Sequence, residues 1–229
     1  PQELAERFGA ELIEASSDEM REYTRSVTEE EIEAEICADR ERFRFPEPIE
    51  DGVYRANTRA CLAIRKWIEA QKLDAFTVNF LKACPAYGID TMPFLEACKA
   101  MTRGIGYAGE GDALDAMLAG VLIRTFETAS FVEIFCPDWK DDRLFLSHMG
   151  EMNYRTAGGI PEIHMRKSNY TDSVMPMAGY ACYRPGKAVY ANVYRDETGF
   201  CLLASAVEMQ QITDDKNFDS VIRGWMKPR

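Results

Sequence analysis

Apolar residues recur at helical spacing over much of the first half of the chain. A capping-box pattern at Thr28–Glu31 predicts the start of an acidic helix, which Pro46 and Pro48 would end. From Gly52 to Lys72 the apolar positions lie three or four residues apart, as in a one-sided amphipathic helix. They are Val53, Ala56, Ala60, Ile64, Trp67 and Ile68.

The pattern then switches between strand and helix. Asp74–Phe80 alternates apolar and polar residues, which predicts a strand. Pro93 suits the first turn of a helix with Asp90 or Thr91 as its cap. Apolar residues lie all around a further helix over Asp112–Phe126, so we expect that helix to be buried.

After about Glu127 the chain consists of short strands and turns. Hairpin signals separate these strands, which is typical of a meander. We therefore expect an α+β fold, with a helix–strand (α/β) layer over residues 1–127 and an antiparallel β meander or barrel-like module over 128–229. The expected strands are Ser130–Cys136, Arg143–Met149, Tyr180–Tyr183, Ala188–Tyr194 and Phe200–Val207.

Composition narrows the classes of function. The net charge is −11 and no basic cluster interrupts it, which argues against nucleic-acid binding. The 7 cysteines are scattered without a Cys-x-x-Cys pair, as in proteins of the reducing cytoplasm. No apolar run reaches the roughly 18 residues of a membrane span, and the N-terminus does not resemble a signal peptide. We expect a cytoplasmic protein without membrane or nucleic-acid partners.

Gly104–Gly109 formally matches the dinucleotide-binding pattern G-x-G-x-x-G. That pattern must follow a strand and open a helix, whereas the segment before Gly104 is predicted to be helical. The glycines more plainly allow a tight crossing between two packed helices, which would hold Glu110 in a constrained position.

Three polar residues stand out in apolar surroundings: Glu110, Glu133 and His148. If they converge, they offer mixed oxygen and nitrogen ligation, which suits Mn²⁺, Mg²⁺ or Co²⁺ better than a structural zinc. The ordinary alternatives are a helix cap for Glu110, an arginine partner for Glu133 and a satisfied core histidine. The spacing alone leaves three rival ligands open: Glu151, Glu162 and His164.

The segment Gly106–Asp112 resembles the Gly-aromatic-Ala-Gly-Glu-Gly-Asp motif of L-arabinose isomerases and their L-fucose isomerase-like relatives. Three further segments resemble motifs of that family and occur in the same order: Thr91–Pro93, Ser130–Glu133 and Leu146–Glu151. The similarity runs from about residue 20 to about residue 155 and fades in the β-rich part.

The resemblance implies an aldose–ketose sugar isomerase that uses a divalent metal, with Mn²⁺ expected first and Mg²⁺ or Co²⁺ as alternatives. It places metal ligands at Glu110, Glu133 and His148, and makes both glutamates the catalytic acid and base. The resemblance also implies that Phe80 and Met149 line the pocket of the sugar substrate. The full-length protein would be a homo-oligomer with active sites at subunit interfaces.

The chain departs from this family in several respects. Its Ala83–Gly88 loop differs, which leaves the sugar open. It lacks the family's Gly-Gly-x-His-His segment, which His164 does not match, and its N-terminal domain. Residues 1–127 would therefore be part of a central domain and 128–229 an incomplete C-terminal module, inactive as an isolated fragment. The alternatives are a non-catalytic sugar-binding or regulatory relative of the same fold, and a structural module.

Overall fold

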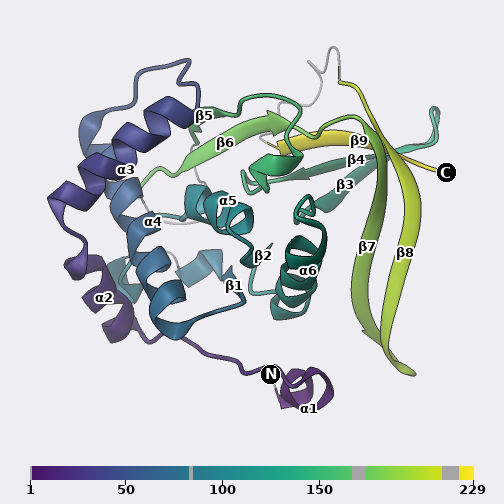
Figure 1. Ribbon diagram of the computed structural model, residues 1–229, viewed down its shortest axis with the longest axis horizontal. Helices are drawn as coiled ribbons and strands as arrows, with labels where there is room; N and C mark the ends of the chain where they lie inside the picture. Colours follow the sequence, from purple (N-terminus) through teal and green to yellow (C-terminus); the bar gives the residue numbers. More distant parts are fainter. Residues whose placement is uncertain (1, 83–84, 167–173, 213–221) are drawn as a thin grey trace.

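Helices form most of the first half of the molecule and strands most of the second (Figure 1). The computed structural model describes residues 2–82, 85–166, 174–212 and 222–229. The helices are α1 (Gln2–Phe8), α2 (Ser17–Ser26), α3 (Glu29–Arg42), α4 (Asp51–Gln71), α5 (Phe94–Thr102) and α6 (Ala113–Phe126). The strands are β1 (Ala75–Val78), β2 (Gly106–Gly109), β3 (Glu133–Asp138), β4 (Arg143–His148), β5 (Glu162–Met165), β6 (Met177–Cys182), β7 (Gly186–Asp196), β8 (Gly199–Gln210) and β9 (Ile222–Pro228). Short 3₁₀ turns lie at Phe80–Lys82, Pro85–Tyr87 and Tyr154–Thr156.

Local sequence signals set several helix ends. The predicted capping box at the start of α3 is confirmed, since the Thr28 hydroxyl accepts from the Glu31 N–H and the Glu31 carboxylate accepts from the Thr28 N–H. The amphipathic helix predicted after Gly52 is α4, which ends where Lys72 adopts a left-handed conformation. The Asp112 carboxylate caps α6 by accepting from the Asp115 N–H.

Strands β1 and β2 pair in parallel, with α5 as the connection between them, and α6 packs on both. A side chain at Gly106 would overlap the Ala116 carbonyl oxygen and the Gly120 backbone of α6. The predicted crossing of two helices at Gly104–Gly109 is therefore wrong. The last four of these residues form strand β2, and Gly106 lets a helix lie directly on that strand.

Helix α6 is not buried on all sides, contrary to the expectation from its apolar sequence. It packs through Ala116, Ala119, Gly120 and Ile123, which are buried. Val121 and Phe126 are 59% and 64% exposed. The small β1–β2 layer covers one face of the helix. Apolar residues on its other faces therefore stay exposed.

Among the described residues, the second half of the chain forms a seven-stranded open sheet. Its main order is β3-β4-β9-β6-β5, and the long β7–β8 hairpin continues from β9. The expectation of a barrel-like module is wrong, because this sheet does not close. It is also not a simple antiparallel meander, since β9 inserts between β4 and β6 and runs parallel to β6. Buried Ile222, Trp225 and Met226 give β9 the apolar content of an internal strand.

The largest core cluster draws on both halves of the chain. Ile64 and Trp67 of α4 belong to the same cluster as Ile163, Met177 and Ala178 of the sheet. Helix α5 makes the direct link, because it contacts β6. The division of the chain at residues 127 and 128 stays a prediction.

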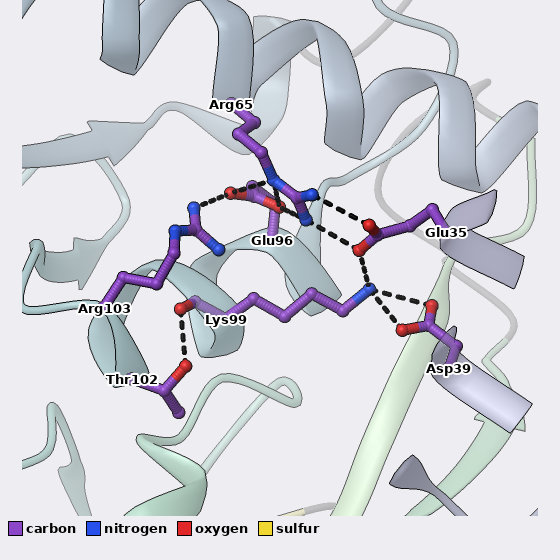
Figure 2. A network of polar contacts seen from close by, with 7 residues as sticks. All are labelled: Glu35, Asp39, Arg65, Glu96, Lys99, Thr102 and Arg103. Atoms are coloured by element: carbon purple, nitrogen blue, oxygen red, sulfur yellow. Dashed lines mark hydrogen bonds and ion pairs between the residues drawn. The ribbon is translucent and has the colours of Figure 1, made fainter. Parts of the chain in front are cut away.

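A network of charged side chains joins α3, α4 and α5 (Figure 2). We call it the charged cluster; it consists of Glu35, Asp39, Arg65, Glu96, Lys99 and Arg103. The Lys99 ammonium lies 2.6 Å from the Glu35 carboxylate and 2.8 Å from Asp39 Oδ2. The Arg65 guanidinium bridges Glu35 and Glu96, and Arg103 also pairs with Glu96. These contacts fix three helices relative to one another.

Candidate active site

The three residues predicted to form the site come from the ends of three strands. Glu110 follows β2, Glu133 begins β3 and His148 ends β4. Strands β3 and β4 are antiparallel with Glu133 opposite Ser147, so Glu133 and His148 lie at the same end of the sheet. The His148 Nε2 atom lies 3.6 Å from Oε1 of Glu133.

Glu110 occupies an unusual backbone conformation. Its φ is +62°, in the left-handed region that residues with a side chain seldom adopt. The next residue, Gly111, also has positive φ, and its N–H donates to the Thr77 hydroxyl at 3.0 Å. The chain therefore turns sharply at Glu110, between β2 and α6, where the Asp112 N–H donates to the Gly109 carbonyl at 3.0 Å.

The His148 ring is held tightly between neighbours. Phe131 meets it edge to face, with ring centroids 5.0 Å apart. On another side lies the backbone of Gly109, where an added Cβ would come within 2.7 Å of the His148 Cε1 atom. Gly109 therefore makes room for the imidazole, which explains part of the glycine-rich motif.

A second carboxylate contacts the other nitrogen of the ring. The His148 Nδ1 atom lies 2.7 Å from Oε2 of Glu151, and the Tyr107 hydroxyl donates to Oε1 of Glu151 at 2.8 Å. Both Tyr107 and Glu151 are buried. In the sequence Glu151 was only a rival ligand, and Tyr107 was not predicted as a site residue. Two signals in the sequence were available: Glu151 follows His148 by three residues, and Tyr107 precedes Glu110 by three residues.

Negative charge dominates the electrostatics of this site. Burial opposes protonation of His148, but Glu151, Glu133 and Glu110 outweigh it and raise the pKa of the imidazole above its usual value. Burial raises the pKa of the Glu133 carboxyl, opposed by His148 and reinforced by Glu110. Carboxylates that repel one another in this way favour a bound cation.

The described residues fit a divalent cation in part. The His148 Nε2 atom is buried and has no hydrogen-bond partner among the described residues, and Glu133 is the nearest carboxylate on that side. One nitrogen is thus free while the other contacts a carboxylate, as is usual for metal-binding histidines. Within the same described ranges, no group of three or more His, Cys, Asp or Glu side chains is arranged to hold a metal. The ligand set of Glu110, Glu133 and His148 therefore stays a prediction.

The other predicted residues lie in varied positions. Phe80 opens the 3₁₀ turn after β1, and Met149 follows His148; both pack partly buried against the main core. His164 lies on β5, separated from β4 by β9 and β6, where its ring contacts Tyr180 and Nε2 is 3.2 Å from Glu162. His164 and Glu162 are therefore remote from His148. Two residues of the Ala83–Gly88 loop, 83 and 84, lie outside the described residues.

A cavity of about 360 Å³ lies between α6 and β7. Its lining includes Leu118, Phe131 and Tyr190, but none of the three predicted site residues. Glu133, by contrast, has a side chain that is 47% exposed. The candidate site in this chain thus lies at the ends of β2, β3 and β4, outside this cavity.

Fold and site together define a mixed α/β protein with a carboxylate–imidazole cluster where its strands end. The family model of the L-arabinose isomerase central domain matches residues 3–127, more than half of the 229 residues. The chain therefore belongs to the L-arabinose isomerase-like family, as its motifs indicated.

Individual relatives agree with this family assignment. The chain is 28% identical over 168 residues to L-arabinose isomerase 2 of Bacillus licheniformis, covering 69% of the chain and 34% of that protein. It is 24% identical over 212 residues to L-arabinose isomerase of Oceanobacillus iheyensis, covering 88% and 44%. The chain thus spans less than half the length of these curated relatives. None of the helices in the described part is both long and apolar enough to cross a membrane.

Proposed function

We propose that this chain supplies the catalytic core of a divalent-metal-dependent aldose–ketose isomerase of carbohydrate metabolism. The observation that carries the proposal is the buried Nε2 of His148, which lacks a hydrogen-bond partner among the described residues and faces Glu133 at 3.6 Å. The names of the relatives make L-arabinose the first sugar to test.

In this proposal Glu110, Glu133 and His148 hold the cation, with Mn²⁺ expected before Mg²⁺ or Co²⁺. The excess of carboxylates around His148 supports that assignment, because their mutual repulsion is relieved by positive charge. When bound, a divalent cation polarises the oxygens on C1 and C2 of the sugar.

The two glutamates divide the proton transfers. Isomerisation moves one proton from C2 to C1 and another from the oxygen on C2 to that on C1. We assign the carbon proton to Glu133, because burial raises the pKa of its carboxyl, and the oxygen proton to Glu110. Phe80 and Met149 would shield the sugar from water on the side of the main core.

The proposal concerns the full-length protein, since the chain spans only part of its relatives. We expect that protein to be a homo-oligomer that completes the site, and this chain to be inactive alone. A reducing cytoplasm fits the described cysteines, which are free thiols.

The test is ketose formation from L-arabinose and other pentoses and 6-deoxyhexoses by the full-length protein with Mn²⁺. Glu133→Gln should lower kcat about 10²–10⁴-fold, the usual loss when a general base is removed, and excess Mn²⁺ should not restore it. Glu162→Gln, on the opposite edge strand, is the matched control and should leave kcat unchanged. Full rescue by Mn²⁺ would show a ligand rather than a base. Sugar binding without turnover by the unaltered protein would favour a non-catalytic relative.

A further inference from the structure

We propose that Glu151 is a positioning residue, which holds His148 in the tautomer that carries its proton on Nδ1. The Nε2 atom is then the nitrogen with a free lone pair, directed toward Glu133. This inference rests on the proposed role of His148 as a ligand, but it concerns the chain before any ligand binds.

The hydrogen bonds to Glu151 carry the argument. The Tyr107 hydroxyl donates to Oε1 at 2.8 Å, and Nδ1 of His148 lies 2.7 Å from Oε2. A carboxylate only accepts, so each of its oxygens takes one donor and Nδ1 must carry the hydrogen. Glu151 is 1% exposed, so water does not compete for these two bonds.

The backbone of Glu151 is held from both sides by one thiol of α5. The Cys98 thiol donates to the Gly150 carbonyl at 3.2 Å and accepts from the Met152 N–H at 3.3 Å. Burial raises the pKa of Cys98 to about 12, so the thiol keeps the hydrogen that it donates. Gly150 itself has φ +136°, and an added Cβ there would lie 2.8 Å from the Ala178 Cβ. The turn that carries Glu151 is therefore held in place by contacts that do not involve His148.

The second histidine of the chain provides a contrast. His164 meets Glu162 through Nε2 at 3.2 Å, and that carboxylate is 43% exposed. A half-exposed glutamate on an edge strand does not hold a ring as a buried one does. Glu162 is accordingly the matched control for Glu151.

The test is the tautomer of His148 by ¹H–¹⁵N NMR of the metal-free 229-residue chain, at alkaline pH where the imidazole is neutral. The chain has 2 histidines, so His164→Gln leaves His148 as the only signal. We expect mainly the Nδ1–H form, whereas free imidazole side chains in water favour Nε2–H. Mainly Nε2–H in this folded chain would overturn the proposal, whether or not any further variant folds.

Two variants sharpen the result. Glu151→Ala should shift His148 toward Nε2–H and weaken Mn²⁺ binding by the full-length protein about 10–100-fold, as losses of such partners usually do. Glu162→Ala should change neither quantity. An unchanged tautomer in folded Glu151→Ala would also overturn the proposal. If the Nδ1–H form is found but the full-length protein neither binds Mn²⁺ nor turns over sugar, the proposed function fails and the positioning role of Glu151 stands.

Discussion

The charged cluster and the candidate site are both polar, yet they are balanced in opposite ways. In the charged cluster three carboxylates face three cations, and each group has a partner of opposite charge (Figure 2). In the candidate site Glu110, Glu133 and Glu151 surround one imidazole. Among the described residues, neither lysine nor arginine forms an ion pair with these carboxylates. The charged cluster is thus balanced in charge, whereas the candidate site has an excess of negative charge.

The two regions should therefore respond differently to loss of a charge. Removing one partner from a buried network leaves an uncompensated charge without water. Removing a carboxylate from a group that repels itself relieves repulsion. Stability measurements can thus separate a structural cluster from a functional one without any knowledge of the substrate.

The largest effect is expected for Lys99→Met. Lys99 is 3% exposed and pairs with both Glu35 and Asp39. The substitution should lower the free energy of unfolding by about 3–5 kcal/mol, because two buried carboxylates would lose their shared cation. Urea denaturation of this chain and of the variant measures the change in the free energy of unfolding.

Arg195→Met is the control for Lys99→Met. The Arg195–Glu3 pair is exposed on both sides, so its loss should lower the free energy of unfolding far less than the loss of Lys99. Equal losses in the two variants would show that the charged cluster is no more structural than a surface ion pair.

A smaller loss is expected for Gly150→Ala. At φ +136° a residue with a Cβ is strained, and that Cβ would press on Ala178 of β6. A loss of about 1–3 kcal/mol is expected from backbone strain of this kind. Gly159→Ala, where an added Cβ meets no atom within 4 Å, is the control. A Gly150→Ala chain as stable as the control would mean that the turn before Glu151 adapts freely.

Acid should weaken the charged cluster through Glu35. Burial pushes the pKa of Glu35 upward, but the Arg65 hydrogen bonds and the Lys99 charge outweigh it and hold that pKa well below its usual range. Its stabilisation is complete above the unfolded value of about 4.3 and is lost as pH falls through the folded pKa. The raised pKa of Asp39, which is due to burial, acts in the opposite sense and makes the net effect modest.

Glu35→Gln tests this assignment. As the pH decreases below about 4, the free energy of unfolding of the unaltered chain should fall more steeply than that of the variant. Only the unaltered chain has this carboxylate to protonate. Parallel curves of unfolding free energy against pH would contradict it.

Local signals predicted the elements that depend on neighbours in sequence. The capping box at Thr28, the amphipathic stripe of α4 and the strand at Ala75–Val78 need only a few adjacent residues to form. The motif residues Glu133 and His148 were likewise found in the sequence, and the fold places Nε2 of His148 3.6 Å from Oε1 of Glu133.

What the sequence did not predict depends on long-range contacts. Lys99 meets Glu35 across 64 residues of chain, so no spacing rule links them. Strand β9 was missed because its place between β4 and β6 is set by pairing with both. Tyr107 looked like part of a glycine motif, and only the fold brings its hydroxyl to Glu151, 44 residues away.

The smallest change in stability is expected for Glu133→Gln, which completes the comparison with Lys99→Met. The Glu133 side chain is 47% exposed, Nε2 of the His148 imidazole lies 3.6 Å from its Oε1 atom, and Glu110 repels it. A half-exposed pair of this kind contributes about 0–1 kcal/mol, and relief of repulsion offsets part of that. The free energy of unfolding should therefore change by less than about 1 kcal/mol in the metal-free chain.

The same urea titrations, run with and without Mn²⁺ on the full-length protein, give the second half of the test. Mn²⁺ should raise the stability of the unaltered protein through mass action and that of the variant much less. A large loss in the metal-free chain would place Glu133 with the charged cluster, as a structural partner of His148.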